Sequence, residues 1–117
     1  MSSVMLAEEV GRSTFGGFSA TVLVHTDMAS PHLENAGTPE QKARWMPSIT
    51  SGEKISAVAV TEPGAGSDLS RIRCRASETG DGWRIAGEKI FISGGDQDVS
   101  DGILHLVLAL AASATAF

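Results

Sequence analysis

Residues 55–68 read ISAVAVTEPGAGSD, an apolar run followed directly by a glycine-rich loop. The run Ile55–Val60 is typical of a buried strand. The loop Thr61–Asp68 is open to two interpretations. It is a tight turn, which is the commoner use of such residues, or it holds an anion. Glycines without a Cβ let backbone amides approach an anion, and Ser67 adds a hydroxyl donor.

Known phosphate-binding motifs do not describe this loop. A dinucleotide fingerprint needs a third glycine three residues after the second, and Leu69 stands in that place. A Walker loop needs a Gly-Lys-Ser/Thr sequence, which is also missing here. The rest of the chain must therefore decide between the turn and the ligand loop.

The pattern of the sequence changes near Lys54 from helical to strand-like. Before it, apolar residues recur at helical spacing, and the TPEQ sequence from Thr38 predicts a capped short helix through Trp45. Pro47 is expected to disturb this helix, and SGEK at residues 51–54 to end the helical part. After it, strands are expected at 55–60, at 71–77, at 83–92 around a turn at 86–88, and from Ile103 onward, with a hairpin turn at 79–82 and a polar loop at 93–102. The sequence predicts an α+β chain in which helices precede antiparallel strands.

Composition excludes several classes of function. The 117 residues suffice for one small domain, and nine basic against fourteen acidic residues, without a basic block, make nucleic acid an unexpected partner. Cys74 is the single cysteine, so we expect no internal disulfide and a reducing, cytoplasmic location. The three histidines lack metal-ligand spacing, so no zinc site is expected (His25, His32 and His105).

No membrane segment is expected from the sequence. The N-terminus lacks the basic start and apolar run of a secretion signal. The uncharged stretch Ile103–Phe117 is too short to span a bilayer, and we interpret it as a buried strand that continues into a ragged end.

Two motifs in order give the chain a resemblance to a known family. GTPEQKARWMPSITSGEKISAVAVTEPGAGSDLSRIR at residues 37–73, followed by GWRIAGEKIFISGG at residues 82–95, resembles the acyl-CoA dehydrogenase family of flavoproteins from about Ala7 to Ala109. The resemblance implies that residues 1–53 end an N-terminal helical domain and residues 54–117 begin a middle β-barrel domain. The chain would then be incomplete, and its last residues, ALAASATAF, suggest truncation or a shifted reading frame.

The resemblance also implies an FAD site. Val60 and Thr61 would lie along the flavin ring, and Gly66 and Ser67 would face the FAD diphosphate, with Ser67 also near the acyl-CoA thioester. The alternative for Thr61 is a turn-capping role. The alternative for Phe91 is a position in the hydrophobic core, which is common for an aromatic residue in a strand. Three further flavin contacts are implied at the end of the second motif: Phe91 over the ring, Ile92 beside it, and Ser93 near N5, where the family usually has threonine.

The implied reaction is α,β-dehydrogenation of an acyl-CoA thioester to trans-2-enoyl-CoA, with electrons passing to an electron-transfer flavoprotein and the whole enzyme forming a homo-oligomer. The family takes its catalytic base from a C-terminal glutamate that no residue here matches, and Glu62 is expected to be a structural or solvated carboxylate. The isolated chain is therefore expected to be inactive and to expose apolar surface. Alternatives are a non-catalytic flavin- or CoA-binding module and an acyl-CoA oxidase or nitroalkane oxidase of the same fold.

Overall fold

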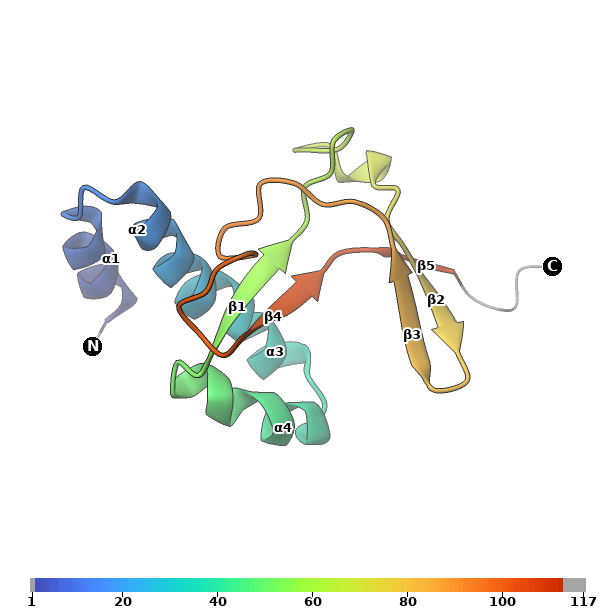
Figure 1. Cartoon of the computed structure of the whole chain (residues 1–117), viewed down its shortest axis with the longest axis horizontal. Coiled ribbons are helices and arrows are strands. Elements are labelled where there is room, and N and C mark those ends of the chain that lie inside the picture. Colours follow the sequence, from blue (N-terminus) through green and yellow to red (C-terminus); the bar gives the residue numbers. More distant parts are fainter. Residues whose placement is uncertain (1, 113–117) are drawn as a thin grey trace. The chain divides into compact units, whose positions relative to one another are not determined.

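The computed structural model describes residues 2–112, and the chain divides into two compact units. The first combines the residues up to Val58 with Ser93–Leu106, and the second combines Ala59–Ile92 with the residues from Val107 onward. Each unit is described by itself. The first contains the α-helices, and the second contains the β-hairpin (Figure 1).

The first unit begins with a succession of helices: α1 (Ser3–Gly11), α2 (Gly16–Leu23), the π-helix η1 (Val24–Ala29), α3 (Ser30–Ala36) and α4 (Pro39–Thr50). The Ser2 hydroxyl caps α1 by accepting a hydrogen bond from the Val4 N–H at 3.3 Å. Gly11 is the last residue of α1, and Gly16 and Gly17 are the first two of α2, so the helical pattern is interrupted where the sequence predicts it. The expected helical N-terminal part is confirmed.

Helix α4 begins as predicted and is not interrupted at Pro47 as expected. Thr38 and Gln41 form the expected capping box, with bonds of 3.2 and 2.9 Å. The expected disturbance after Trp45 is absent, because the helix continues past Pro47 to Thr50, directly before the SGEK sequence that was expected to end the helical part. Proline removes one backbone donor, but the last turn is closed by the bond from Ser51 N to Pro47 O and anchored by buried Ile49.

Two strands belong to the first unit except for the last residue of each. β1 (Lys54–Ala59) pairs with β4 (Gly102–Val107), which confirms the strands expected at 55–60 and from Ile103. β1 is fixed to the preceding helices through His25, whose Nδ1 lies 2.8 Å from the Ser56 Oγ and accepts a 2.9 Å bond from the Ser56 N–H. His25 is thus a half-buried polar residue with a structural role. The described residues contain no group of three or more side chains able to hold a metal ion.

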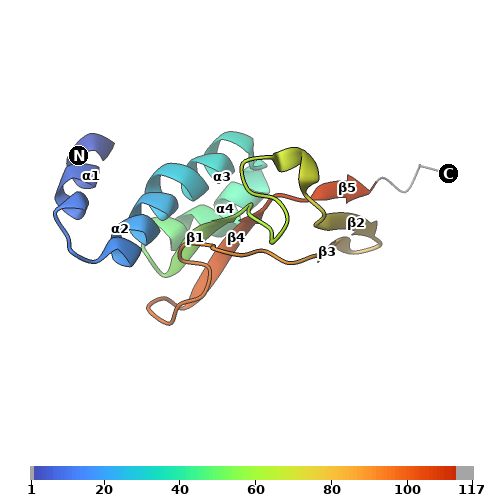
Figure 2. The ribbon, with the colours of Figure 1, turned by 90° about the horizontal axis from the view of Figure 1, so that it is seen from above.

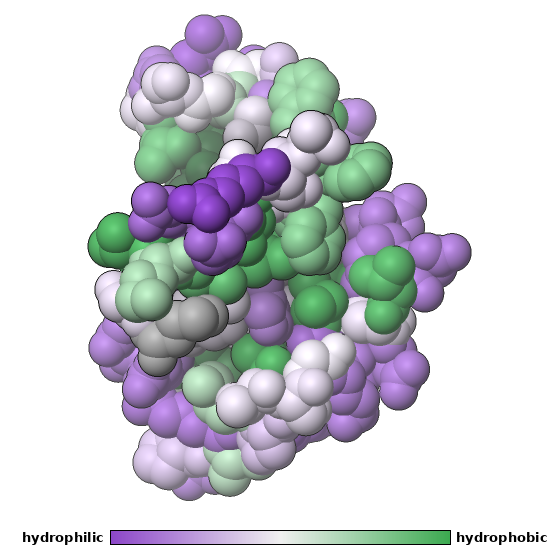
Figure 3. Space-filling model, turned by 90° about the vertical axis from the view of Figure 1, so that its left-hand side faces the viewer, coloured by the Kyte–Doolittle hydropathy of each residue, from purple (hydrophilic) through white to green (hydrophobic). Residues whose placement is uncertain are grey.

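Apolar side chains remain exposed on the first unit. Val4 and Phe15 are each 73% exposed and Phe18 is 61% exposed. Figure 3 shows hydrophobic residues interspersed with hydrophilic ones on one face of the molecule. The expected exposed apolar surface is therefore present. No helix among residues 2–112 is long and apolar enough to cross a membrane.

The second unit contains a three-stranded sheet of order β3-β2-β5, made by β2 (Arg75–Thr79), β3 (Gly82–Ala86) and β5 (Leu110–Ala112). β2 and β3 form the expected antiparallel hairpin, closed by the pair Thr79 and Gly82. β5 lies beside β2 on the side away from β3 and runs parallel to it (Figure 2). The α+β class is confirmed, while the ragged end expected beyond residue 112 lies outside the described residues.

Two expected strands of the second unit are shorter than the sequence pattern suggests. The strand expected at 71–77 begins only at Arg75, because Leu69–Arg71 forms the 3₁₀ turn η2 and the N–H groups of Arg73 and Cys74 bond to the Glu62 carboxylate. Beyond β3, the extension expected at 89–92 is not a strand; Ile90 N donates to Thr61 O at 3.0 Å. The core of the unit is Ala65, Ile72 and Cys74, against which Val107 and Ala109 pack.

Candidate functional site

The glycine-rich loop begins with a closed turn. Glu62 N donates to Ala65 O at 2.9 Å, and Ala65 N donates to Glu62 O at 3.1 Å. Ala65 is buried, whereas Pro63 and Gly64 between the two residues are exposed. The loop is therefore a tight turn in its first half, and the question of a ligand concerns its exposed second half.

A buried carboxylate holds this turn in place. Glu62 accepts hydrogen bonds from Arg73 N at 2.7 Å, from Cys74 N at 2.9 Å and from Lys89 Nζ at 2.9 Å. Lys89 Nζ also donates to Val60 O at 2.9 Å, and the Lys89 and Glu62 side chains are only 12% and 6% exposed. We call this group, Glu62 with Lys89 and the two backbone amides, the Glu62 lock. It joins three segments distant in sequence.

The lock keeps Glu62 ionised. The N–H of Arg73, helped by Lys89 and the N–H of Cys74, lowers the pKa of Glu62 from 4.5 to about 2, although burial acts in the opposite direction. A carboxylate with these three donors is a poor proton acceptor, so Glu62 is structural, as expected, and is not the base of a reaction. Lys89 was not identified from the sequence; its place after Gly87 in the second motif was the only signal.

The lowered pKa predicts how stability depends on pH. Because the folded-state pKa lies below the ordinary value, the contribution of Glu62 is full above about pH 4.5 and is lost as the pH falls towards 2. We expect the urea midpoint of the wild-type chain to fall through this range more steeply than that of Glu62→Gln. Equal slopes would contradict this expectation. Glu40 supplies a comparison, because its pKa is also lowered, by its own backbone N–H and by the Thr38 hydroxyl, but it is exposed; Glu40→Gln should therefore reduce the steepness less than Glu62→Gln.

The predicted flavin contacts of the second unit fall into two groups. Val60 and Thr61 are half-buried, and the bond from Ile90 N to Thr61 O places Thr61 beside the segment that leads into Phe91 and Ile92. The other group, Gly66 and Ser67, is exposed. Within the described residues, the N–H groups of Gly66 and Ser67 make no hydrogen bond. Ser93 is exposed and lies in the first unit, so it is described apart from the others.

These residues fit a ligand with an anionic part and a planar part. Nothing lies within 4 Å of where a Cβ on Gly64 or Gly66 would be, so an anion can approach the loop amides closely. Phe91 is 88% exposed and has a φ of 57°, an uncommon conformation for a residue other than glycine. An exposed aromatic ring on a constrained backbone offers a surface against which a planar ring can stack.

Comparison with known proteins identifies the class to which this fold and loop belong. The family model described as "Acyl-CoA dehydrogenase, N-terminal domain" matches residues 1–53 of this chain. The chain is 41% identical over 97 residues to the mitochondrial long-chain specific acyl-CoA dehydrogenase of Mus musculus, covering 81% of this chain and 22% of that protein. These matches define the chain as one of the acyl-CoA dehydrogenase class.

Solved structures support the same family assignment. The acyl-CoA dehydrogenase of Geobacillus kaustophilus superposes with a TM-score of 0.80 at 37% identity, covering 92% of this chain and 27% of that one. The acyl-CoA dehydrogenase of Bacillus anthracis, solved in complex with FAD, gives 0.77 at 33% identity, with 93% and 18% covered. The chain belongs to the acyl-CoA dehydrogenase family and spans about a fifth of the length of the first curated relative it matches.

Proposed function

We propose that this chain forms the flavin-contacting part of an FAD-dependent acyl-CoA dehydrogenase, an enzyme that converts an acyl-CoA thioester to a trans-2-enoyl-CoA. One observation carries the proposal. The Glu62 lock and the bond between Ile90 and Thr61 hold two segments together, while the donors of Gly66 and Ser67 and the ring of Phe91 remain exposed. The hydrogen-bonded segments would thus hold the exposed amides and the exposed ring in position for a ligand.

Each predicted contact has a role in this proposal. The amides of Gly66 and Ser67 would hold the FAD diphosphate, and the Ser67 hydroxyl would also lie near the thioester. Val60, Thr61 and Ile92 would lie along the flavin, with Phe91 over its ring. The Ser93 hydroxyl would donate a hydrogen bond at N5; serine keeps the donor of the family's usual threonine but lacks the methyl that restricts its rotamer. When bound, FAD would supply an acceptor for the β-hydrogen as hydride.

The α-proton requires a base that this proposal does not assign to the chain. The loop Thr61–Asp68 contains two acidic residues: the lock occupies the Glu62 carboxylate, and the Asp68 carboxylate accepts hydrogen bonds from the N–H and the hydroxyl of Ser70. The base would therefore come from residues beyond those described, as would most of the acyl pocket. Electron-transfer flavoprotein as acceptor, a homo-oligomeric state and a cytoplasmic location are parts of the same proposal. The location rests on the free, buried thiol of Cys74.

A chimera tests the proposal most directly. Residues 2–112 would replace the equivalent segment of the FAD-bound Bacillus anthracis relative, and the purified product would be assayed for flavin absorbance and for acyl-CoA-dependent reduction of a dye and of oxygen. We expect a yellow protein that reduces the dye in preference to oxygen. Ser93→Ala should lower the rate about 100-fold, while Ser93→Thr should preserve it.

The outcomes separate the alternatives. A colourless, folded chimera would contradict the flavin assignment, and a yellow chimera without acyl-CoA-dependent reduction would favour the non-catalytic module. Preference for oxygen would favour the oxidases. Activity of the isolated chain would require a base in it and would overturn the assignment of the base to other residues.

A further inference from the structure

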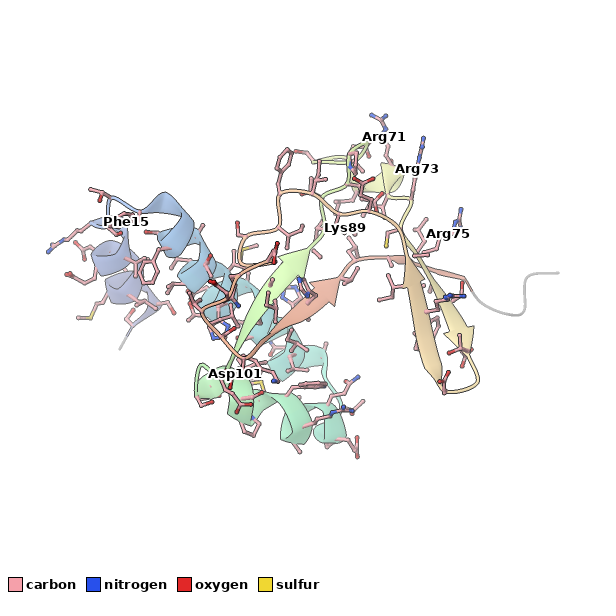
Figure 4. The ribbon with its side chains drawn as sticks, in the orientation of Figure 1. Phe15, Arg71, Arg73, Arg75, Lys89 and Asp101 are labelled. Atoms are coloured by element: carbon pink, nitrogen blue, oxygen red, sulfur yellow. The ribbon has the colours of Figure 1, made fainter. Side chains whose placement is uncertain are left out.

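The segment between the glycine-rich loop and strand β2 has a feature without a role in the proposed flavin site. From Arg71 onward every second residue is an arginine as far as Arg75, and the intervening Ile72 and Cys74 are only 6% and 2% exposed. The three arginines are exposed, and their side chains project outward on the same side of the chain (Figure 4). The alternation directs the apolar residues into the core and the guanidinium groups to solvent.

The hairpin adds a fourth arginine to this face. Arg84 pairs with Ser77, and Arg75 pairs with Ala86, so Arg84 is the diagonal neighbour of Arg75 on the same face of the sheet. Arg84 is also exposed. We call Arg71, Arg73, Arg75 and Arg84 the arginine row. It holds four of the nine basic residues of a chain whose net charge is −5.

The arginine row is not neutralised by its surroundings. Within the part of the chain that the structure describes, the ion pairs join Arg12 to Glu9, Lys54 to Glu53 and Lys89 to Glu62, and none includes an arginine of the row. Alternate residues of an extended chain lie about 6–7 Å apart. Neighbouring guanidinium groups can therefore engage separate anionic groups of one ligand, each by paired hydrogen bonds.

A small pocket adjoins the arginine row. It has a volume of about 240 Å³ and connects the turn of the glycine-rich loop to Arg73: its lining comprises Glu62, Pro63, Gly64, Arg73, Cys74, Gly87 and Glu88. The Glu62 charge is paired with Lys89 at 2.9 Å, so among the residues that line the pocket only the carboxylate of Glu88 remains to oppose the guanidinium group of Arg73. A hollow beside a row of guanidinium groups favours a compact phosphorylated ligand over a flat acidic protein surface.

We propose that the arginine row binds the phosphate groups of a nucleotide ligand, and that this ligand is the nucleotide end of the acyl-CoA. The choice of CoA rests on the proposed function, whereas the polyphosphate chemistry rests on the arginines alone. CoA carries three phosphate groups at its nucleotide end, two in a diphosphate and one on the ribose, which match a row of separate guanidinium groups. The row would set affinity for CoA without contact with the reacting carbons.

Calorimetric titration of the full chain with CoA, in the absence of FAD and of any acyl group, tests the proposal. We expect Arg73→Gln/Arg75→Gln to weaken CoA binding about tenfold or more. Arg12→Gln/Arg44→Gln removes the same charge from the first unit and should change affinity less than about twofold. Raising the salt concentration should weaken wild-type binding and reduce the difference between the two variants. Urea midpoints would confirm that both variants fold.

Three results would overturn the proposal: no CoA binding by the wild-type chain, equal weakening by the two double variants, or row-dependent binding of a polyglutamate peptide in preference to CoA. The last would identify an acidic protein as the partner. The titration is independent of the flavin. A chain that binds CoA through the arginine row but gives a colourless chimera would contradict the proposed function and leave this inference standing.

Discussion

Lys89→Met should destabilise the second unit more than the loss of any surface charge. The substitution leaves the Glu62 carboxylate buried without its cation and removes the donor to Val60 O, since Lys89 Nζ lies 2.9 Å from both acceptors. Removing one partner of a buried ion pair is strongly destabilising, because the remaining charge is still desolvated. We expect the urea midpoint to fall by about 1 M or more.

Amide hydrogen exchange can show whether the loss of stability begins at the Glu62 lock. The N–H groups of Arg73 and Cys74 bond to the Glu62 carboxylate, so their protection reports directly on the Glu62 lock. Both amides should exchange much faster in Lys89→Met. The matched control is Lys54→Met, which removes the cation from a more exposed pair 3.7 Å from Glu53 and should shift the midpoint only slightly. Similar shifts of the urea midpoint in the two variants would show that the lock contributes no more to the stability of the unit than an exposed ion pair does.

The sequence predicted the elements whose signals are local. The capping box of α4 and the hairpin at 79–82 depend on residues a few positions apart, and both were found where the sequence placed them. The continuation of α4 past Pro47 was not predicted, since the burial of Ile49 is a tertiary contact that outweighs the local effect of Pro47. The late start of β2 has the same origin. Two amides expected in a strand ladder bond to a carboxylate eleven and twelve residues earlier.

The candidate site shows the same division. The glycines and the serine of the loop could be selected from the sequence, because a lack of side chain and a free hydroxyl are properties of single residues. The lock could not be found in this way. Glu62 and Lys89 are 27 residues apart, and only the folded chain brings them together with Val60. The residues that hold the loop in place could therefore not be predicted from the sequence, whereas the residues that the loop exposes could be.

Gly87→Ala should be the most damaging small substitution in the second unit. Gly87 has a φ of 151°, and a Cβ at this position would lie 2.8 Å from the Cys74 Cα and 2.9 Å from its Sγ. Alanine would therefore add a backbone penalty and a collision with main-chain atoms, which cannot move aside as a flexible side chain would. The displaced residue would be Cys74, whose N–H is part of the Glu62 lock. Stability should fall by about 3 kcal/mol or more.

Gly82→Ala separates the two causes, because Gly82 has nearly the same φ, 150°, with nothing within 4 Å of the added Cβ. It should cost about 1–2 kcal/mol from the backbone alone. The difference between the two variants, measured by urea unfolding, then gives the cost of pressing a methyl group against Cys74. Protection of the Cys74 amide should be reduced by Gly87→Ala and retained in Gly82→Ala. Equal losses of stability would contradict this prediction. They would mean that Cys74 moves away from the added methyl group at no measurable cost in free energy.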